Sequence, residues 1–198
     1  MFKLAITGGM ASGKSTASMF FKKKGGFIFD ADLEAKKHLQ YSVALQHKML
    51  NAFGPDLKKK SGKIDLKTLS ERAFSNTDLH QILNGIMWPE IYLLIEKKII
   101  QKTKEGVPLF VVDAALVFEA NFSNLFDAIL LITADEEIRI KRAIRRHSLS
   151  INQIEKRMNL QMPEVEKKQL TKYVIYNNNT IDKLQGDLEI FYQKTIFS

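Results

Sequence analysis

The most constraining feature of this chain is the octapeptide at residues 8–15, Gly-Gly-Met-Ala-Ser-Gly-Lys-Ser, which matches the G-x-x-x-x-G-K-[ST] pattern of a phosphate-binding loop. Residues 2–7 before it form a short apolar run typical of a buried strand, and residues 16–24 after it have the pattern of a helix. This order lets the loop amides and the helix N-terminus point together at a polyphosphate. A chance glycine turn is the alternative, and the strand–loop–helix context disfavours it.

The motif predicts a role for several of its residues. Gly8 and Gly13 allow a backbone conformation that a Cβ atom would hinder. The Lys14 ammonium is expected to reach the β- and γ-phosphates of ATP, and the Ser15 hydroxyl is expected to ligate Mg²⁺. The ATP-binding residues predicted in the loop are Gly9, Met10, Ala11, Ser12, Gly13, Lys14, Ser15 and Thr16.

The composition indicates a globular protein. A chain of 198 residues that is 45% hydrophobic is expected to form one domain with a substantial core. Cysteine is absent, which excludes a disulfide framework, a thiol nucleophile and a zinc–thiolate site. The chain has no apolar run long enough to span a bilayer, and the first predicted strand leaves no room for a signal peptide. We therefore expect a cytoplasmic protein with no membrane partner.

The net charge is +8 and the isoelectric point is near 9.5, so the chain suits a polyanionic partner. A basic nucleotide-binding regulator that binds RNA or DNA is one possibility. Such a protein would interleave aromatic and basic residues to stack bases, and the sequence contains no run of that kind. Nucleic acid is therefore not expected as a partner, and the charge by itself leaves an anionic lipid or a polyanionic small molecule open.

Five short apolar runs separated by helical stretches predict a parallel β-sheet buried on both faces. The predicted strands are Leu4–Thr7, Phe27–Asp30, Leu109–Asp113, Ala128–Thr133 and Tyr173–Tyr176. We predict an α/β, P-loop NTPase-type three-layer fold with a five-stranded parallel sheet, a helical insertion and a helical lid, in a single kinase domain over residues 1–198.

The helical insertion is predicted at residues 33–105, between the second and third strands. It is expected to contain a helix over residues 33–53, another that begins after Asp65 as its N-cap, and a long one at about 78–104. Pro89 is expected to kink or divide the last of these helices. A P-loop kinase could carry its acceptor-binding part in such an insertion.

A lid is predicted at residues 147–165, a polar segment interrupted by Pro163. A mobile lid that closes over phosphates would have this composition, and an ordinary amphipathic hairpin is the equally weighted alternative.

The helix predicted before the lid, residues 135–146, carries four arginines. Arg139, Arg142 and Arg146 share one helical face, and Arg145 lies off it. Because a guanidinium binds phosphate oxygens bidentately, this face suits stabilisation of the γ-phosphate. A purely solvated position is the alternative for Arg139 and Arg145.

Carboxylates follow two of the predicted strands. Asp30 and Asp32 come at the end of the second strand, where ligands of α/β sheets bind, and one of them could accept a proton from an acceptor hydroxyl. Asp113 ends the third strand, where a Walker-B aspartate helps to hold Mg²⁺. Glu119 could orient an acceptor or a metal-bound water. The alternatives are a helix cap for Asp32, a cap or turn for Asp113 and an ordinary surface position for Glu119.

Taken in order, these motifs resemble those of the dephospho-CoA kinase family over nearly the whole chain. The loop alone is generic, but its combination with the Asp-Ala-Asp triplet and the Phe-Glu element is specific. The resemblance is carried by Ile6 to Thr16, Phe29 to Asp32, Leu83-Asn84 with Pro89, Leu116 to Glu119, Arg142 with Arg146, Arg157 with Gln161, and Val174 to Asn177.

The resemblance implies ATP-dependent phosphorylation of the ribose 3′-hydroxyl of dephospho-CoA, giving coenzyme A and ADP, with Mg²⁺ as cofactor. Asp32 would be the base, and Lys14 and Arg146 would be the other catalytic residues. The remaining implied residues are Arg142 and Asn177 for ATP, Asp30, Asp32, Phe118 and Glu119 for the acceptor, and Ser15 and Asp113 for the metal. Asn177 could instead be a turn residue. Another small-molecule or nucleotide kinase is the alternative function.

The chain departs from the family pattern at four places. Ala11 replaces a loop glycine, so the backbone there must avoid a positive φ or accept strain. Trp88 stands where the family usually has histidine, Ala115 replaces a proline, and residues 172–173 replace an Ala-Asp pair. None of these positions coincides with the implied catalytic residues.

Overall fold

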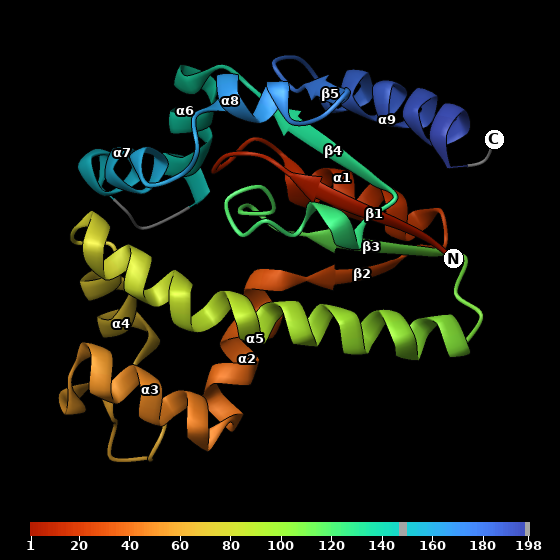
Figure 1. Ribbon diagram of the computed structural model, residues 1–198. Helices are drawn as coiled ribbons and strands as arrows, with labels where there is room; N and C mark the ends of the chain where they lie inside the picture. Colours follow the sequence, from red (N-terminus) through yellow and green to blue (C-terminus); the bar gives the residue numbers. More distant parts are fainter. Residues whose placement is uncertain (147–149, 197–198) are drawn as a thin grey trace. The chain divides into compact units, whose positions relative to one another are not determined.

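The computed structural model describes residues 1–146 and 150–196 (Figure 1). Within these residues the strands form a five-stranded parallel sheet in the order β2-β3-β1-β4-β5. The strands are β1 Phe2–Thr7, β2 Phe27–Asp30, β3 Leu109–Asp113, β4 Ala128–Thr133 and β5 Tyr173–Tyr176. The predicted α/β fold with its five parallel strands is confirmed, and β1 covers the whole apolar run of residues 2–7, two residues more than the strand predicted at Leu4–Thr7.

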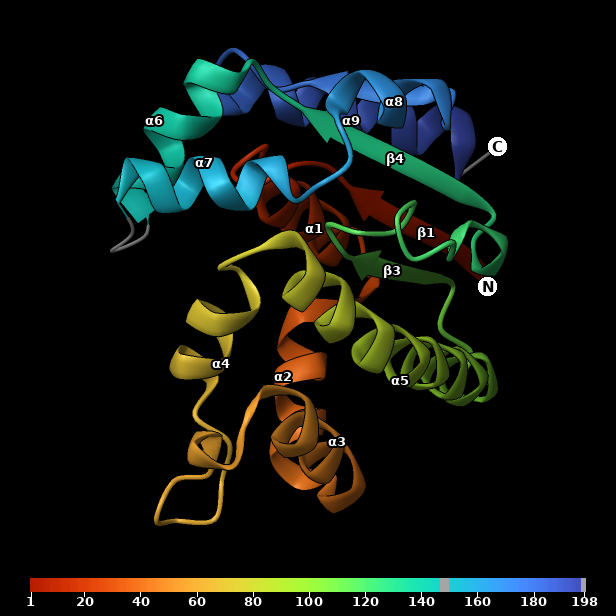
Figure 2. The ribbon, with the colours of Figure 1, turned by 60° about the vertical axis from the view of Figure 1, so that its left-hand side comes forward.

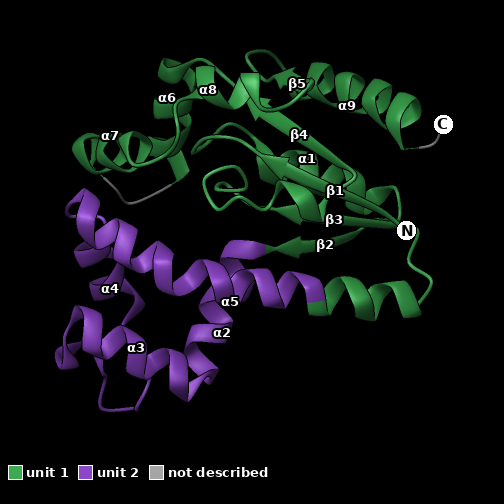
Figure 3. Ribbon diagram, in the orientation of Figure 1, with its two compact units in different colours: residues 1–30, 97–198 green, residues 31–96 purple. Residues whose placement is uncertain are grey.

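The chain divides into two compact units (Figure 3). Unit 1 comprises Met1–Asp30 and Lys97–Ser198 and contains the sheet, and unit 2 comprises Ala31–Glu96 and is helical. Helix α5, Thr77–Lys104, runs through the boundary between the two units in the sequence.

A large apolar cluster of unit 1 lies on one face of the sheet. Alternate residues of the central strands, such as Leu4 and Ile6 of β1, pack there against helices α1 (Lys14–Lys23) and α9 (Ile181–Thr195). The other face carries stacked rings of Phe27 and Phe110, and α8 (Glu164–Gln169) contacts β4. Between β4 and α8 come α6 (Glu136–Arg146) and α7 (Ile151–Asn159). Helices therefore cover both faces, as in a three-layer α/β fold.

The topology places the phosphate-binding loop at the carboxyl end of the central strand. The arrowheads of β1, β3 and β4 point to the same end of the sheet (Figure 2). The connection after β1 leads to β2 on one side of the sheet, and the connection after β3 leads to β4 on the other side, so a crevice for ligands is expected where β1 and β3 are neighbours. Asp30 and Asp113, the last residues of β2 and β3, are register partners at this end.

Unit 2 is built from α2 (Ala31–Tyr41), α3 (Val43–Phe53), the short 3₁₀ helix η1 (Pro55–Leu57), α4 (Leu66–Ala73) and the first part of α5. Its interior is an apolar cluster that includes Leu45, Met49, Phe53, Leu57 and Leu69.

The helices of unit 2 differ from the prediction at Ser42 and at Pro89. The single helix predicted at 33–53 is two helices, because Ser42 lies between them and its hydroxyl accepts a hydrogen bond from the Leu45 amide that caps α3. Asp65 caps α4 as predicted. Pro89 lies inside a continuous α5, so it does not divide that helix. Among the described helices, none combines the length and the apolar character needed to cross a membrane.

Candidate phosphate-binding site

The loop between β1 and α1 uses left-handed and other glycine conformations. Gly8 has φ 145° and Gly13 has φ 110°. A Cβ atom would collide with the Ile132 carbonyl at Gly8 and with the Asn177 amide at Gly13, so both positions require glycine. Ala11 has φ 58°, in the left-handed region. The loop therefore accepts the strain that the alanine imposes, at a cost of about 1–2 kcal/mol.

The N-terminus of α1 is arranged to receive an anion. The helix begins at Lys14, two residues before the predicted start, and its N-cap Gly13 supplies no side-chain hydrogen bond. The first turn contains no acidic residue. The first amides of a helix have no intrahelical acceptor and carry the positive end of its dipole, so they attract phosphate. The Lys14 ammonium lies across the loop and donates to the carbonyls of Gly8 (3.0 Å) and Gly9 (3.2 Å).

A carboxylate from β3 reaches the same helix. The Ser18 hydroxyl donates to Oδ2 of Asp113 at 2.7 Å, and Ser18 is a buried residue of α1. Ser15, one helical turn before Ser18, is exposed at the start of the helix. Ser18 was not predicted as a site residue, although its spacing from Ser15 places the two on neighbouring positions of the helix surface.

The residues at this point fit a hard divalent cation. The hydroxyl of Ser15 and the carboxylate of Asp113 supply oxygen ligands, which Mg²⁺ prefers. Among the residues described, no three His, Asp or Glu side chains gather as a metal-binding group. A Mg²⁺ ion at Ser15 and Asp113 would therefore take its other ligands from phosphates and water, as it does in many nucleotide sites.

The two aspartates of the Asp-Ala-Asp triplet occupy different elements. Asp30 is the exposed last residue of β2 and belongs to unit 1. Asp32 is exposed in the first turn of α2 and belongs to unit 2. Helix α2 begins at Ala31, so Asp32 lies inside the helix and is not its N-cap, which removes that alternative.

The arginines of α6 differ in their surroundings. Arg139 is buried, its Nε donates to the Ala134 carbonyl at 3.0 Å, and it is therefore not on a solvated face. Arg142 has a buried NH1 without a hydrogen-bond partner within the described residues. Burial, and then the like charge of Arg146, lowers the pKa of the Arg142 guanidinium from its ordinary value. A phosphate at this place would satisfy both the unpaired N–H and the charge. Arg146 is the exposed last residue of α6.

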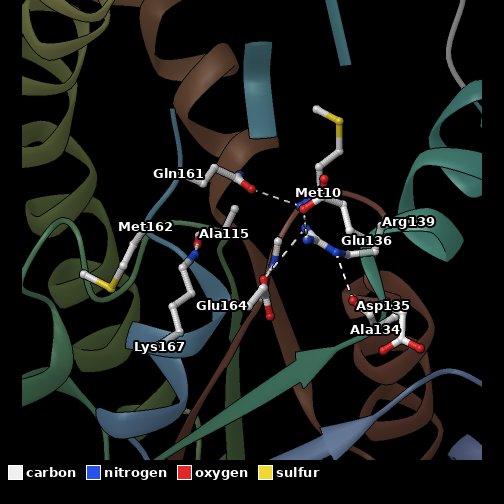
Figure 4. A network of polar contacts seen from close by, with 12 residues as sticks. Met10, Ala115, Ala134, Asp135, Glu136, Arg139, Gln161, Met162, Glu164 and Lys167 are labelled. Atoms are coloured by element: carbon white, nitrogen blue, oxygen red, sulfur yellow. Dashed lines mark hydrogen bonds and ion pairs between the residues drawn. The ribbon is translucent and has the colours of Figure 1, made fainter. Parts of the chain in front are cut away.

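Two side chains from the segment after α7 bind the first half of the loop (Figure 4). The Gly9 amide donates to Oε1 of Glu164 at 2.8 Å, and the Met10 amide donates to Oε1 of Gln161 at 3.0 Å. Direct contacts of Gly9 and Met10 with ATP therefore remain predictions. Of the predicted lid, residues 147–149 lie outside the described residues, and the rest is α7, the connection after it and the start of α8.

Glu119 is part of a buried ion pair. Its Oε1 accepts from the Met162 amide at 3.0 Å and lies 2.9 Å from Nζ of Lys167. Lys167 is completely buried and also donates to the Ala115 carbonyl at 3.0 Å. Glu119 is therefore not an ordinary surface glutamate, and the adjacent Phe118 is buried. Lys167 was not predicted as a site residue, because a lysine within a polar run is rarely buried.

Asn177 holds the second half of the loop. Its side-chain amide donates to the Ser12 carbonyl at 2.8 Å, and its backbone amide donates to the Thr133 carbonyl at 2.7 Å. The side chain is buried against the loop. Asn177 thus fixes the loop backbone next to the start of α1, a contact that was not predicted from the sequence.

Comparison with known proteins gives a consistent result. Residues 2–183 match the family model CoaE, described as dephospho-CoA kinase. A dephospho-CoA kinase of Carboxydothermus hydrogenoformans is 34% identical over 96% of this chain and 93% of its own length. The fold also matches a solved structure from Thermus thermophilus titled TT1252, with a TM-score of 0.79 at 25% identity, covering 98% of this chain and 97% of that one. A Campylobacter jejuni dephospho-CoA kinase matches with a TM-score of 0.71 at 27% identity and the same coverage.

Proposed function

The chain belongs to the dephospho-CoA kinase family, and from that premise we propose how its residues divide the transfer of a phosphoryl group from ATP to dephospho-CoA. The reaction is the phosphorylation of the ribose 3′-hydroxyl, which yields coenzyme A and ADP. The observation that carries this function is the match over residues 2–183, which includes a complete phosphate-binding loop followed by an uncapped helix N-terminus.

The ATP-binding role falls to the loop, α1 and α6. The amides at the start of α1 and the Lys14 ammonium bind the β- and γ-phosphates. Arg142 contacts a phosphate through its unpaired NH1, and Arg146 stabilises the charge that develops on the transferring group. Asn177 supports ATP binding by holding the Ser12 carbonyl.

The cofactor in this proposal is Mg²⁺, held by the Ser15 hydroxyl and the Asp113 carboxylate. When it is bound, the ion neutralises charge on the β- and γ-phosphates. Ser18 keeps the Asp113 carboxylate oriented by donating to one of its oxygens.

The acceptor role is assigned to the end of β2, to α2 and to the Phe118–Glu119 element. Asp32 accepts the proton of the 3′-hydroxyl, and Asp30 helps to bind the acceptor. Residues 33–105 are proposed to bind the CoA portion, and residues 147–165 to act as the lid.

An acceptor panel tests the proposal. The protein is mixed with ATP, Mg²⁺ and either dephospho-CoA, nucleosides, nucleotides or other small alcohols, and ADP release is measured. We expect rapid release with dephospho-CoA and none with the Lys14→Ala variant, whose far-UV spectrum should match the wild type. Release with another acceptor but not with dephospho-CoA would favour a different small-molecule or nucleotide kinase, and wild-type turnover in Lys14→Ala would contradict the loop assignment.

A further inference from the structure

The segment of residues 161–167, which we call the strap, contacts both the phosphate-binding loop and the segment after β3. On one side Gln161 and Glu164 accept hydrogen bonds from the Met10 and Gly9 amides. On the other side, the Met162 amide and Lys167 bind Glu119 of the segment after β3. Figure 4 shows Gln161 and Glu164 directed toward the loop, with Lys167 directed toward Ala115. The strap is therefore anchored at one side while it holds the loop at the other.

The Glu164 carboxylate has few other partners. Its side chain is 15% exposed, and Oε2 is buried without a hydrogen-bond partner within the described residues. The nearby cation is Arg139, whose NH1 lies 3.9 Å from Oε1 of Glu164, beyond hydrogen-bonding distance. Because burying a carboxylate is costly unless it is hydrogen bonded, the Gly9 amide is an important compensation for the burial of Glu164.

Side chains from different segments bind the backbone in the two halves of the loop. The amides of Gly9 and Met10 are bound by side chains of the strap, and the Ser12 carbonyl is bound by Asn177. Gly13, the N-cap residue of α1, supplies no side-chain hydrogen bond to the helix. Side chains thus fix the loop backbone at Gly9, Met10 and Ser12, and the N-terminus of α1 that follows is the part proposed to bind phosphate.

We propose that Gln161 and Glu164 are positioning residues for ATP binding, which fix the Gly9–Met10 backbone so that the loop presents the α1 amides to the phosphates. This inference rests on the proposed function only in taking ATP as the phosphoryl donor. A neutral side-chain oxygen is sufficient for this role, because the Gly9 and Met10 amides need only an oxygen within hydrogen-bonding distance to which they can donate.

The opposite arrangement would have the Glu164 carboxylate compete with phosphate for the loop. In that case removal of the carboxylate would tighten the binding of ATP, because a repulsive charge would be lost. The sign of the change in affinity therefore separates positioning from competition.

The test measures the binding of a non-hydrolysable ATP analogue with Mg²⁺ by calorimetry, in the absence of acceptor. Glu164→Ala and Gln161→Ala should each bind the analogue about fivefold more weakly, as expected for the loss of one hydrogen bond that orders the loop. Glu164→Gln should bind nearly as the wild type does, because its amide oxygen can still accept from Gly9. The KM for ATP should rise in parallel, and the KM for dephospho-CoA should not change.

The matched controls are Glu166→Ala and Gln169→Ala, at two exposed positions of α8, the helix that begins with Glu164. Both control variants should bind the analogue with wild-type affinity. All proteins are measured well below their own unfolding temperatures, so a purely structural role would lower the unfolding temperature and leave the affinity unchanged. Wild-type affinity in both alanine variants, or tighter binding in Glu164→Ala, would overturn the proposal. If Glu164→Ala does not fold, Gln161→Ala and Glu164→Gln decide.

The failure of the proposed function would look different. A wild-type protein that does not bind the analogue would contradict its assignment as an ATP-dependent kinase. A wild-type protein that binds the analogue but does not phosphorylate dephospho-CoA would contradict the acceptor alone, and the positioning role would still be decided by the variants.

Discussion

The two units of the chain use polar residues in contrasting ways. In unit 1, buried polar side chains join segments far apart in the sequence, as Lys167 joins Glu119 and Asn177 joins Ser12. In unit 2, the ion pairs lie nearer the surface, as between Asp56 and Arg72, and the interior is an apolar cluster around Met49.

The contrast teaches where stability and function reside. Exposed ion pairs contribute little to stability because water and salt screen them, so unit 2 depends on apolar burial. Buried polar contacts fix a specific geometry, and their loss leaves an unpaired group in a poorly solvated place. Polar substitutions in the interior of unit 1 should therefore disturb ATP binding, and apolar substitutions in the interior of unit 2 should lower stability and leave ATP binding unchanged.

The largest effect is expected at Asp32, the residue of unit 2 that the proposed reaction needs. Asp32→Asn keeps the size of the side chain and removes its proton-accepting charge, so kcat should fall by about 10²–10⁴-fold. The affinity for the ATP analogue should be nearly unchanged. The matched variant is Asp30→Asn, and a larger loss of kcat there than in Asp32→Asn would reverse the assignment within the triplet.

The second-largest effect is expected from a substitution that disrupts the buried polar network of unit 1. Lys167→Met leaves the Glu119 carboxylate without its cation, so the free energy of unfolding should fall by about 3–5 kcal/mol in denaturant titrations. Binding of the ATP analogue should also weaken, because the strap loses its anchor. The control is Lys23→Met at an exposed position in the last turn of α1, which should leave both values unchanged.

A second substitution sharpens the same point. Adding Glu119→Gln to Lys167→Met removes the uncompensated charge, so the double variant should be more stable than Lys167→Met alone. If the double variant is less stable by the full sum of the single effects, the pairing of these two residues carries no coupling and this account of the network is wrong.

The third-largest effect is expected from a substitution that leaves a cavity in the apolar cluster of unit 2. Met49 is completely buried, so Met49→Ala should lower the free energy of unfolding of its surroundings by about 2–5 kcal/mol. Amide hydrogen exchange should rise in α3 and α4, and the affinity for the ATP analogue should stay at the wild-type value. Val43→Ala, at a side chain that is 67% exposed, is the control. Weakened ATP binding in Met49→Ala would show that the apolar interior of unit 2 also supports the binding of ATP, which contradicts the contrast between the units.

The smallest effect concerns the strained loop residue. Ala11→Gly relieves the cost of φ 58° and should raise the free energy of unfolding by up to about 1 kcal/mol, after the added chain entropy of glycine is subtracted. The same change at Ala52, an exposed helical position of α3, should lower it by about 1 kcal/mol. Thermal or chemical unfolding measures both changes. If the free energy of unfolding falls in both glycine variants, the loop alanine is not strained.

The prediction of the fold from the sequence succeeded where a local pattern is decisive. Four of the strands have the predicted bounds, because each is a continuous apolar run between polar segments. The break at Ser42 was missed, because the helical pattern continues across it and only the capping geometry ends one helix and begins the next. Asp65, which directly precedes a helical pattern, was predicted correctly as a cap.

The sequence by itself determined the phosphate-binding loop, the parallel sheet and the family, because these depend on glycine, lysine and apolar residues at fixed spacings. Only the tertiary structure decided which polar side chains hold that loop. The contact of Gly9 with Glu164 spans 155 positions of the chain, and that of Ser12 with Asn177 spans 165. Such pairs leave no periodic signal in the sequence, because folding brings the two residues together and the choice of partner is made by the packing of α8 and β5 around the loop.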